Sequence, residues 1–103
     1  MKFKLSYKKF IIGYLIYDEF WYFTYSEAFK EQDKYKPLVQ FPMIDKDYKS
    51  KNLWAFFLLR IPSLKQPSIQ SIIEKEGIST DYPSLLERFG KKVIQNPYIL
   101  ERI

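Results

Sequence analysis

The chain has 103 residues, no cysteine and no histidine, and its 17 lysines and arginines against 12 aspartates and glutamates give a net charge of +5. The missing residue types exclude a disulfide framework, thiol chemistry, a zinc site and a Ser-His or Cys-His nucleophile pair. A chain of this length predicts one domain over residues 1–103 with a core of its own. The absence of cysteine fits a reducing cytoplasm.

Residues 2–25 predict a three-stranded antiparallel meander. Apolar and polar residues alternate over 2–7, as in a strand with one wet face. The β-branched and aromatic runs 10–17 and 20–25 predict the next two strands, each entered through a charged turn. Gly13 inside the second run indicates a bulge or a close backbone approach.

The lysines of the first strand and the apolar run after them do not form a signal peptide. Residues 10–17 contain two tyrosines, end at Asp18-Glu19 and lack a small-residue cleavage site. No apolar run reaches the roughly 20 residues of a membrane helix.

The next segment mixes short elements with charged loops. Ser26 predicts the N-cap of a short helix over 27–32. Residues 38–41 predict a short strand at a sheet edge, since Pro42 cannot donate to a ladder. Residues 45–51 predict a charged loop.

The most apolar stretch of the second half runs from Leu53 to Leu59. Ser50 or Asn52 would cap a helix here and Pro62 would stop it, which leaves about two and a half turns. This helix has apolar residues on two faces, so it has two surfaces to cover. One interpretation is a core helix buried on both sides; the other is that one face meets the sheet while Trp54 and the following loop meet a partner.

Two further helices and a tail complete the chain. Residues 67–76 carry an isoleucine stripe followed by Gly77, and Asp81 caps a helix that Gly90 ends. Residues 98–100 predict a possible final strand. Strands in the first half and helices in the second predict an α+β fold, with an antiparallel sheet and two or three short helices packed on one face.

The sequence contains no constellation that predicts catalysis. It has no glycine-rich phosphate loop, and the paired carboxylates lie in loops without a companion base, so we expect no enzyme, no metal and no cofactor. The alternative is a basic module for single-stranded nucleic acid, in which one set of strand aromatics, either Trp21, Phe23 and Tyr25 or Phe20 and Tyr22, would stack bases. The three apolar helical stripes instead predict that helices cover that face.

Several landmarks follow one another in a specific order. They are Ile12 to Leu15, Trp21 to Tyr25, Pro37-Leu38, Phe41-Pro42, Phe56-Phe57, Arg60 to Ser63, Glu76 to Ile78 and Leu85 to Gly90. Over nearly the whole chain this order resembles the N-terminal subdomain of HipA-type Ser/Thr kinase toxins. The turn at 60–63 and residues 91–98, which lack a glycine-rich sequence, favour the stand-alone form found as HipS-like antitoxins of tripartite HipBST systems.

The resemblance implies a cytoplasmic antitoxin that binds and inhibits a HipT-like Ser/Thr kinase toxin. It implies that a HipB-like DNA-binding protein joins through the complex, so that this chain itself contacts neither nucleic acid nor membrane. The kinase family modifies aminoacyl-tRNA synthetases.

The contact elements follow from the two-faced helix and the proline-bounded loop after it. We expect docking beside the kinase's nucleotide cleft, because a rigid aromatic fills a pocket at low entropy cost. The predicted partner-binding residues are Trp54, Arg60, Ile61, Pro62, Ser63, Leu64, Lys65 and Gln66. Trp21 is a competing candidate, although its place in an alternating strand favours the core.

Overall fold

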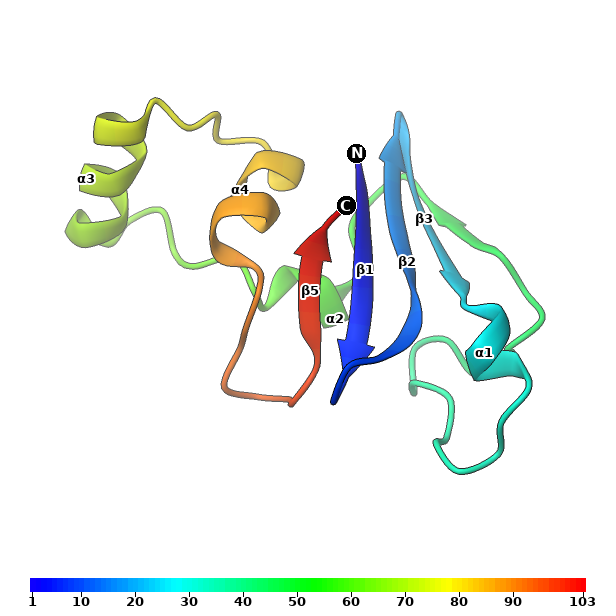
Figure 1. The fold of residues 1–103 in the computed structure, drawn as a ribbon. Helices are drawn as coiled ribbons and strands as arrows, with labels where there is room; N and C mark the ends of the chain where they lie inside the picture. The colour runs from blue at the N-terminus through cyan, green and yellow to red at the C-terminus, as the bar shows by residue number, and fades with distance from the viewer.

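Five strands form one antiparallel sheet in the computed structural model, which describes residues 1–103. In the order β4-β3-β2-β1-β5, the strands are β4 (Tyr48–Ser50), β3 (Phe20–Tyr25), β2 (Phe10–Asp18), β1 (Lys2–Tyr7) and β5 (Ile99–Arg102). The helices are α1 (Glu27–Lys30), α2 (Ala55–Leu58), α3 (Pro67–Glu76) and α4 (Tyr82–Phe89). The predicted α+β class, the meander and the final strand are confirmed, and both chain ends lie at the same end of the sheet (Figure 1).

A bulge interrupts the pairing of β1 with β2 beside Gly13. The register passes from Leu5 opposite Gly13 to Ser6 opposite Ile11, which leaves Ile12 without a partner. A Cβ atom on Gly13 would lie 2.5 Å from the Thr24 carbonyl oxygen and 2.9 Å from the Phe23 ring. Both interpretations of this glycine, a bulge and a close approach, are therefore confirmed.

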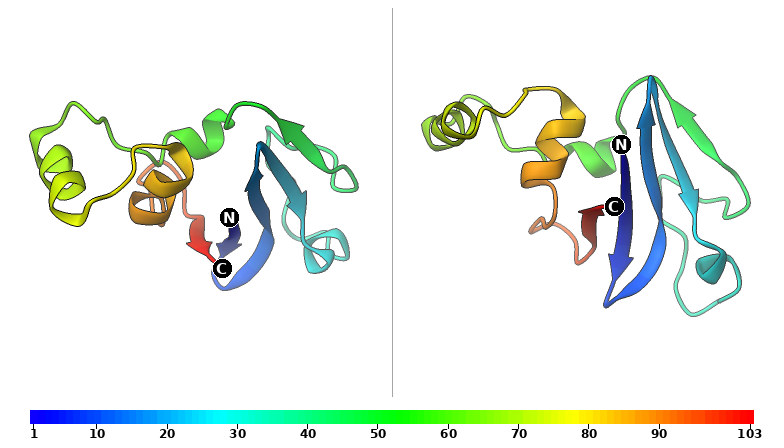
Figure 2. Two further views of the ribbon diagram at one scale, coloured as in Figure 1. Left: turned by 90° about the horizontal axis from the view of Figure 1, so that it is seen from above. Right: turned by 45° about the horizontal axis from the view of Figure 1, so that its top comes forward.

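One face of the sheet forms the core. Seven of the side chains that alternate onto this face are buried: Phe3, Leu5, Leu15, Trp21, Phe23, Tyr25 and Leu100. Phe57 of α2 and Leu86 of α4 join the same apolar cluster. Figure 2 shows these two helices on the same side of the sheet. The prediction that Trp21 belongs to the core is confirmed.

The opposite face of the sheet stays open, which corrects the expectation that helices cover the second set of strand aromatics. Apart from Ser6, which is buried, the side chains that alternate onto it are exposed or half-buried; they include Lys2, Lys4, Tyr14, Ile16, Phe20, Tyr22, Thr24 and Lys49. Burial of one set of strand aromatics therefore leaves Phe20 and Tyr22 at the surface.

The predicted strand over Leu38–Phe41 is wrong. The Phe41 N–H donates to the Leu38 carbonyl at 2.9 Å, which closes a turn. The Tyr25 hydroxyl accepts from the Leu38 N–H at 2.9 Å and donates to the Phe41 carbonyl at 2.5 Å. With these groups satisfied by a side chain, no ladder forms here, and the edge strand is β4, inside the segment predicted as a loop.

The central helix is shorter than predicted and begins later. Its N-cap is Trp54, not Ser50 or Asn52, and the Trp54 side chain makes no capping hydrogen bond; the Gln40 side-chain oxygen accepts from the Phe56 N–H at 3.3 Å instead. Further turn bonds, from Arg60 N–H to the Phe57 carbonyl and from Ile61 N–H to the Leu58 carbonyl, continue the bend up to Pro62. At the end of β3 the cap is as predicted: the Ser26 hydroxyl accepts from the Phe29 N–H at 3.1 Å, although the helix ends at Lys30.

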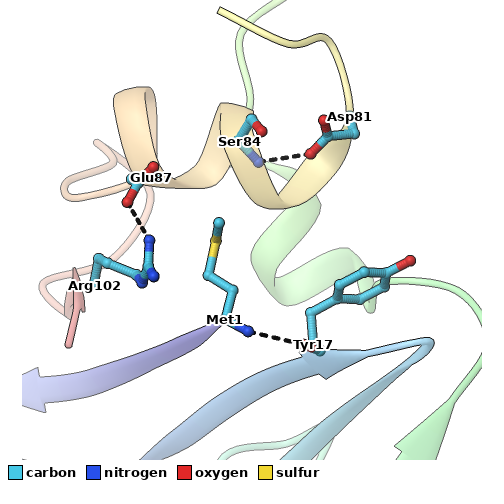
Figure 3. A network of polar contacts seen from close by, with 6 residues as sticks. All are labelled: Met1, Tyr17, Asp81, Ser84, Glu87 and Arg102. Atoms are coloured by element: carbon cyan, nitrogen blue, oxygen red, sulfur yellow. Dashed lines mark hydrogen bonds and ion pairs between the residues drawn. The ribbon is translucent and has the colours of Figure 1, made fainter.

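Polar contacts lie within helix α4, within the sheet and between the two (Figure 3). Asp81 accepts from the Ser84 N–H at 2.9 Å and caps the helix as predicted. Glu87 forms an ion pair with Arg102 of β5. The amino-terminal ammonium of Met1 donates to the Tyr17 carbonyl at 3.0 Å. The ion pair between Glu87 and Arg102 joins α4 to β5, while α3 lies beyond α4 at the far end of the molecule (Figures 1 and 2).

Candidate docking surface

Trp54 lies at the N-terminal end of α2, between the core and the surface. Its ring packs edge-to-face on Phe41, with centroids 5.0 Å apart and planes at 84°. The side chain is half-buried, whereas its neighbour Ala55 is exposed. Part of the indole is therefore held by the core and part remains free for a partner.

Arg60 is not at the surface, and this corrects its place among the expected contact residues. It is 3% exposed. Its guanidinium donates to the carbonyls of Gly90, Lys91 and Tyr98 and to the Asn96 side-chain oxygen, at 2.9 to 3.1 Å. Burial lowers the pKa of Arg60 to about 10. The side chain thus joins the end of α2 to the segment between α4 and β5.

The loop after Arg60 faces outward. Ile61 and Pro62 are half-buried, and Ser63, Leu64, Lys65 and Gln66 are exposed. The Ser63 hydroxyl accepts from the Lys65 N–H at 3.3 Å, and the Gln70 amide donates to the Leu64 carbonyl at 3.0 Å. These bonds give the loop a defined shape against α3.

Helix α3 supplies an apolar surface that the sequence reasoning assigned to the core. Ile69, Ile72 and Ile73 share one face, yet α3 is the one helix of the four without a buried residue. The exposed Leu64 of the preceding loop adds to this surface, at 37%. The three isoleucines are half-buried, and a partly exposed apolar stripe of this kind is typical of an interaction surface. We define the docking surface as residues 61–66 together with Ile69, Ile72 and Ile73.

The pairing of α3 with α4 is polar. Arg88 of α4 donates twice to Glu76 of α3, at 2.8 and 3.0 Å. This contact lowers the pKa of Glu76 and raises that of Arg88. Gly77, in the left-handed region at φ 63°, then ends the helix as predicted. The bridge fixes the end of α3 while the isoleucine face remains accessible.

No group of three or more His, Cys, Asp or Glu side chains is arranged to hold a metal ion. No helix has both the length and the apolarity needed to cross a membrane. No protein-family profile matches the chain, and no curated protein matches its sequence.

Proposed function

We propose that this chain is an antitoxin-like inhibitor that binds a HipA-like Ser/Thr kinase toxin of the HipT type in the cytoplasm. The order of landmarks from Ile12 to Gly90 suggests this partner. A HipB-like DNA-binding protein would join through the kinase complex, and this chain would contribute no catalytic group, metal or cofactor.

One observation of the structure carries the docking part of the proposal. The loop 61–66 and the isoleucine face of α3 form a continuous stretch of chain whose apolar side chains are exposed at Leu64 and only half-buried at the isoleucines. Burial of apolar surface at about 25 cal/mol per Å² is the main favourable term in protein association. Covering these side chains would therefore stabilise a complex.

The proposed mechanism is steric. Phosphoryl transfer depends on the positions of nucleotide, metal and acceptor more than on covalent chemistry by the protein. A domain docked at the mouth of the cleft, with Trp54 beside the loop as an aromatic anchor, would prevent the closure that sets those positions. Arg60 has no part in the contact and acts by holding the loop's base.

Charge substitutions on the docking surface test this proposal. Leu64→Glu and Ile72→Glu place a carboxylate in an apolar contact, so we expect each to weaken binding to the purified kinase at least tenfold, about 1.4 kcal/mol. Ser71→Glu adds the same charge to the exposed neighbour of Ile72, outside the isoleucine stripe, and should change affinity little. If calorimetry gave equal affinities for all three variants, the docking surface would not be part of the interface with the kinase.

The open sheet face supports a second candidate, a module for single-stranded nucleic acid. Tyr14, Phe20 and Tyr22 lie on it beside lysines, as base stacking requires. However, the Lys2 ammonium lies 4.5 Å from the Tyr14 ring centroid and that of Lys49 lies 4.3 Å from Phe20, so lysines already occupy these rings. Binding to an oligonucleotide that falls steeply with added salt would favour this candidate.

A further inference from the structure

A groove at the end of the sheet opposite the chain termini is lined by aromatic side chains. Its volume is about 620 Å³, and Tyr7, Tyr35, Phe56 and Tyr98 are among the residues that line it. Edge-on contacts join these rings, with centroids 5.6 Å apart for Tyr7 and Tyr35 and 5.9 Å apart for Tyr7 and Tyr98. The hydroxyls of Tyr25 and Tyr48 form hydrogen bonds within the chain, whereas those of the three groove tyrosines do not. They remain available to the carbonyl groups of a ligand.

The outer wall of the groove is a turn held in place from the core. Leu38, Val39 and Gln40 form this wall, and the Tyr25 hydroxyl bonds the backbone at both of its ends. Val39 is 96% exposed. Because hydrogen bonds from the buried Tyr25 side chain hold this wall, its shape does not depend on a ligand.

The lining of the groove carries positive charge. Lys36 is the one charged residue of the lining, which contains no aspartate or glutamate. At the rim, the Lys8 ammonium lies 5.3 Å from the Tyr7 ring centroid and that of Lys34 lies 5.4 Å from Tyr35. None of these lysines forms an ion pair within the chain. Carboxylates on either side of an apolar anchor would complement this rim.

The turn that carries Lys8 is strained in a way that points to function. Lys8 and Lys9 have φ angles of 49° and 69° in the two-residue turn between β1 and β2. Asn-Gly is the favoured pair for such a turn, because both central residues need positive φ. Two lysines here lower stability, and strain of this kind gathers at functional sites.

We propose that this groove binds a short extended peptide segment that carries an apolar side chain between acidic residues. The rings would bury the apolar side chain, the free tyrosine hydroxyls would donate to the peptide backbone, and the rim lysines would face the carboxylates. The groove shares no residue with the docking surface, so this inference stands or fails separately from the proposed kinase inhibition.

Selection from a random 12-residue peptide library on the full chain tests the proposal. We expect the enriched peptides to have an apolar centre flanked by aspartate or glutamate. By fluorescence anisotropy, Val39→Glu should weaken the affinity for the best peptide at least tenfold, whereas Ile94→Glu should leave this affinity within twofold of the wild-type value. Ile94 is a matched control, since it is fully exposed, apolar and outside the groove. Neutral or basic peptides, no enrichment, or equal binding by both variants would overturn the proposal.

A turn substitution separates binding from folding. Lys8→Asn with Lys9→Gly should raise Tm by about 4 °C or more, because the strain is removed, yet weaken the selected peptide about fivefold through loss of charge at the rim. Lys51→Gln with Lys75→Gln removes two exposed lysines elsewhere and should not change peptide affinity. Unchanged affinity in the turn variant would overturn the role of the rim lysines.

Discussion

Two polar side chains within the fold hold segments that the apolar core alone would leave free. Tyr25 fixes the turn over 38–41, and Arg60 fixes the segment between α4 and β5. Each reaches backbone groups far along the chain, and each does so from within or next to a regular element. Their energetic roles are therefore testable one residue at a time.

The Tyr25 hydroxyl makes a pH-dependent contribution to stability. Burial raises the pKa of Tyr25 from 10.0 to about 12. Its protonated form is favoured in the folded state, so this contribution is complete below pH 10 and is lost as the pH rises from 10 to 12. We expect Tyr25→Phe to cost about 1–2 kcal/mol at pH 7, since it leaves the Leu38 N–H and the Phe41 carbonyl unpaired. The free energy of unfolding of the variant, measured with urea, should then decline less between pH 10 and 12 than that of the wild-type chain. Equal declines in the two proteins would refute this assignment.

Arg60 should be among the most sensitive positions of the chain. Arg60→Ala leaves buried carbonyls without donors, and we expect a loss of about 3 kcal/mol in the free energy of unfolding. Arg60→Lys should recover little, because one ammonium cannot reach acceptors spread across a planar fork. The measurement is the urea midpoint. Arg88→Ala, which breaks an exposed bridge, serves as the control and should shift it far less.

At the scale of elements, local patterns predicted what local interactions decide. The meander, the Ser26 and Asp81 caps and the end of α3 at Gly77 all follow from signals within a few residues. Strand alternation also identified Trp21 as a core residue. These features depend on backbone geometry and side-chain period, which a single segment contains.

The predictions that were wrong share one cause: the residues that decide the structure at these positions lie far away in the sequence. The segment 38–41 alternates like a strand, but the Tyr25 hydroxyl satisfies its backbone. Arg60 follows an apolar run and was expected at the surface, but its acceptors lie some thirty to forty residues later. The isoleucine period of α3 predicted an amphipathic helix correctly, yet period alone does not say whether its own domain or another molecule covers the apolar face.

The bulge beside Gly13 leads to a prediction for β2. A glycine-to-alanine change inside a strand usually improves stability, because it lowers the entropy of the unfolded chain. Here the new Cβ would meet the Thr24 carbonyl at 2.5 Å, so we expect Gly13→Ala to destabilise the protein by about 2 kcal/mol or more. Gly77→Ala is the matched control. It meets no atom within 4 Å and is strained only by its φ of 63°, about 1 kcal/mol. If thermal unfolding showed that Gly13→Ala stabilises the protein, β2 and β3 would have to lie farther apart than this close approach implies.

At the scale of the whole molecule, distinct surfaces surround one core. The docking surface lies with α3 at one end, the tyrosine groove lies at the end of the sheet away from the chain termini, and the open sheet face carries rings covered by lysines (Figures 1 and 2). The first two share no residue, so the two proposed partners would not compete for the same side chains. The proposed inhibition of a kinase depends on the first of them.

The most direct test is a titration of the purified chain into a HipA-like kinase that lacks an N-terminal subdomain, with phosphoryl transfer from ATP as the readout. We expect kinase activity to fall to the baseline near one equivalent of wild-type chain. We also expect the Trp54→Ala variant, once its Tm shows that it is folded, to inhibit the kinase at least about thirtyfold less potently than the wild-type chain. This is the loss expected for an aromatic anchor worth about 2 kcal/mol. Undiminished kinase activity at saturating concentrations of the wild-type chain would contradict the claim that it is an inhibitor.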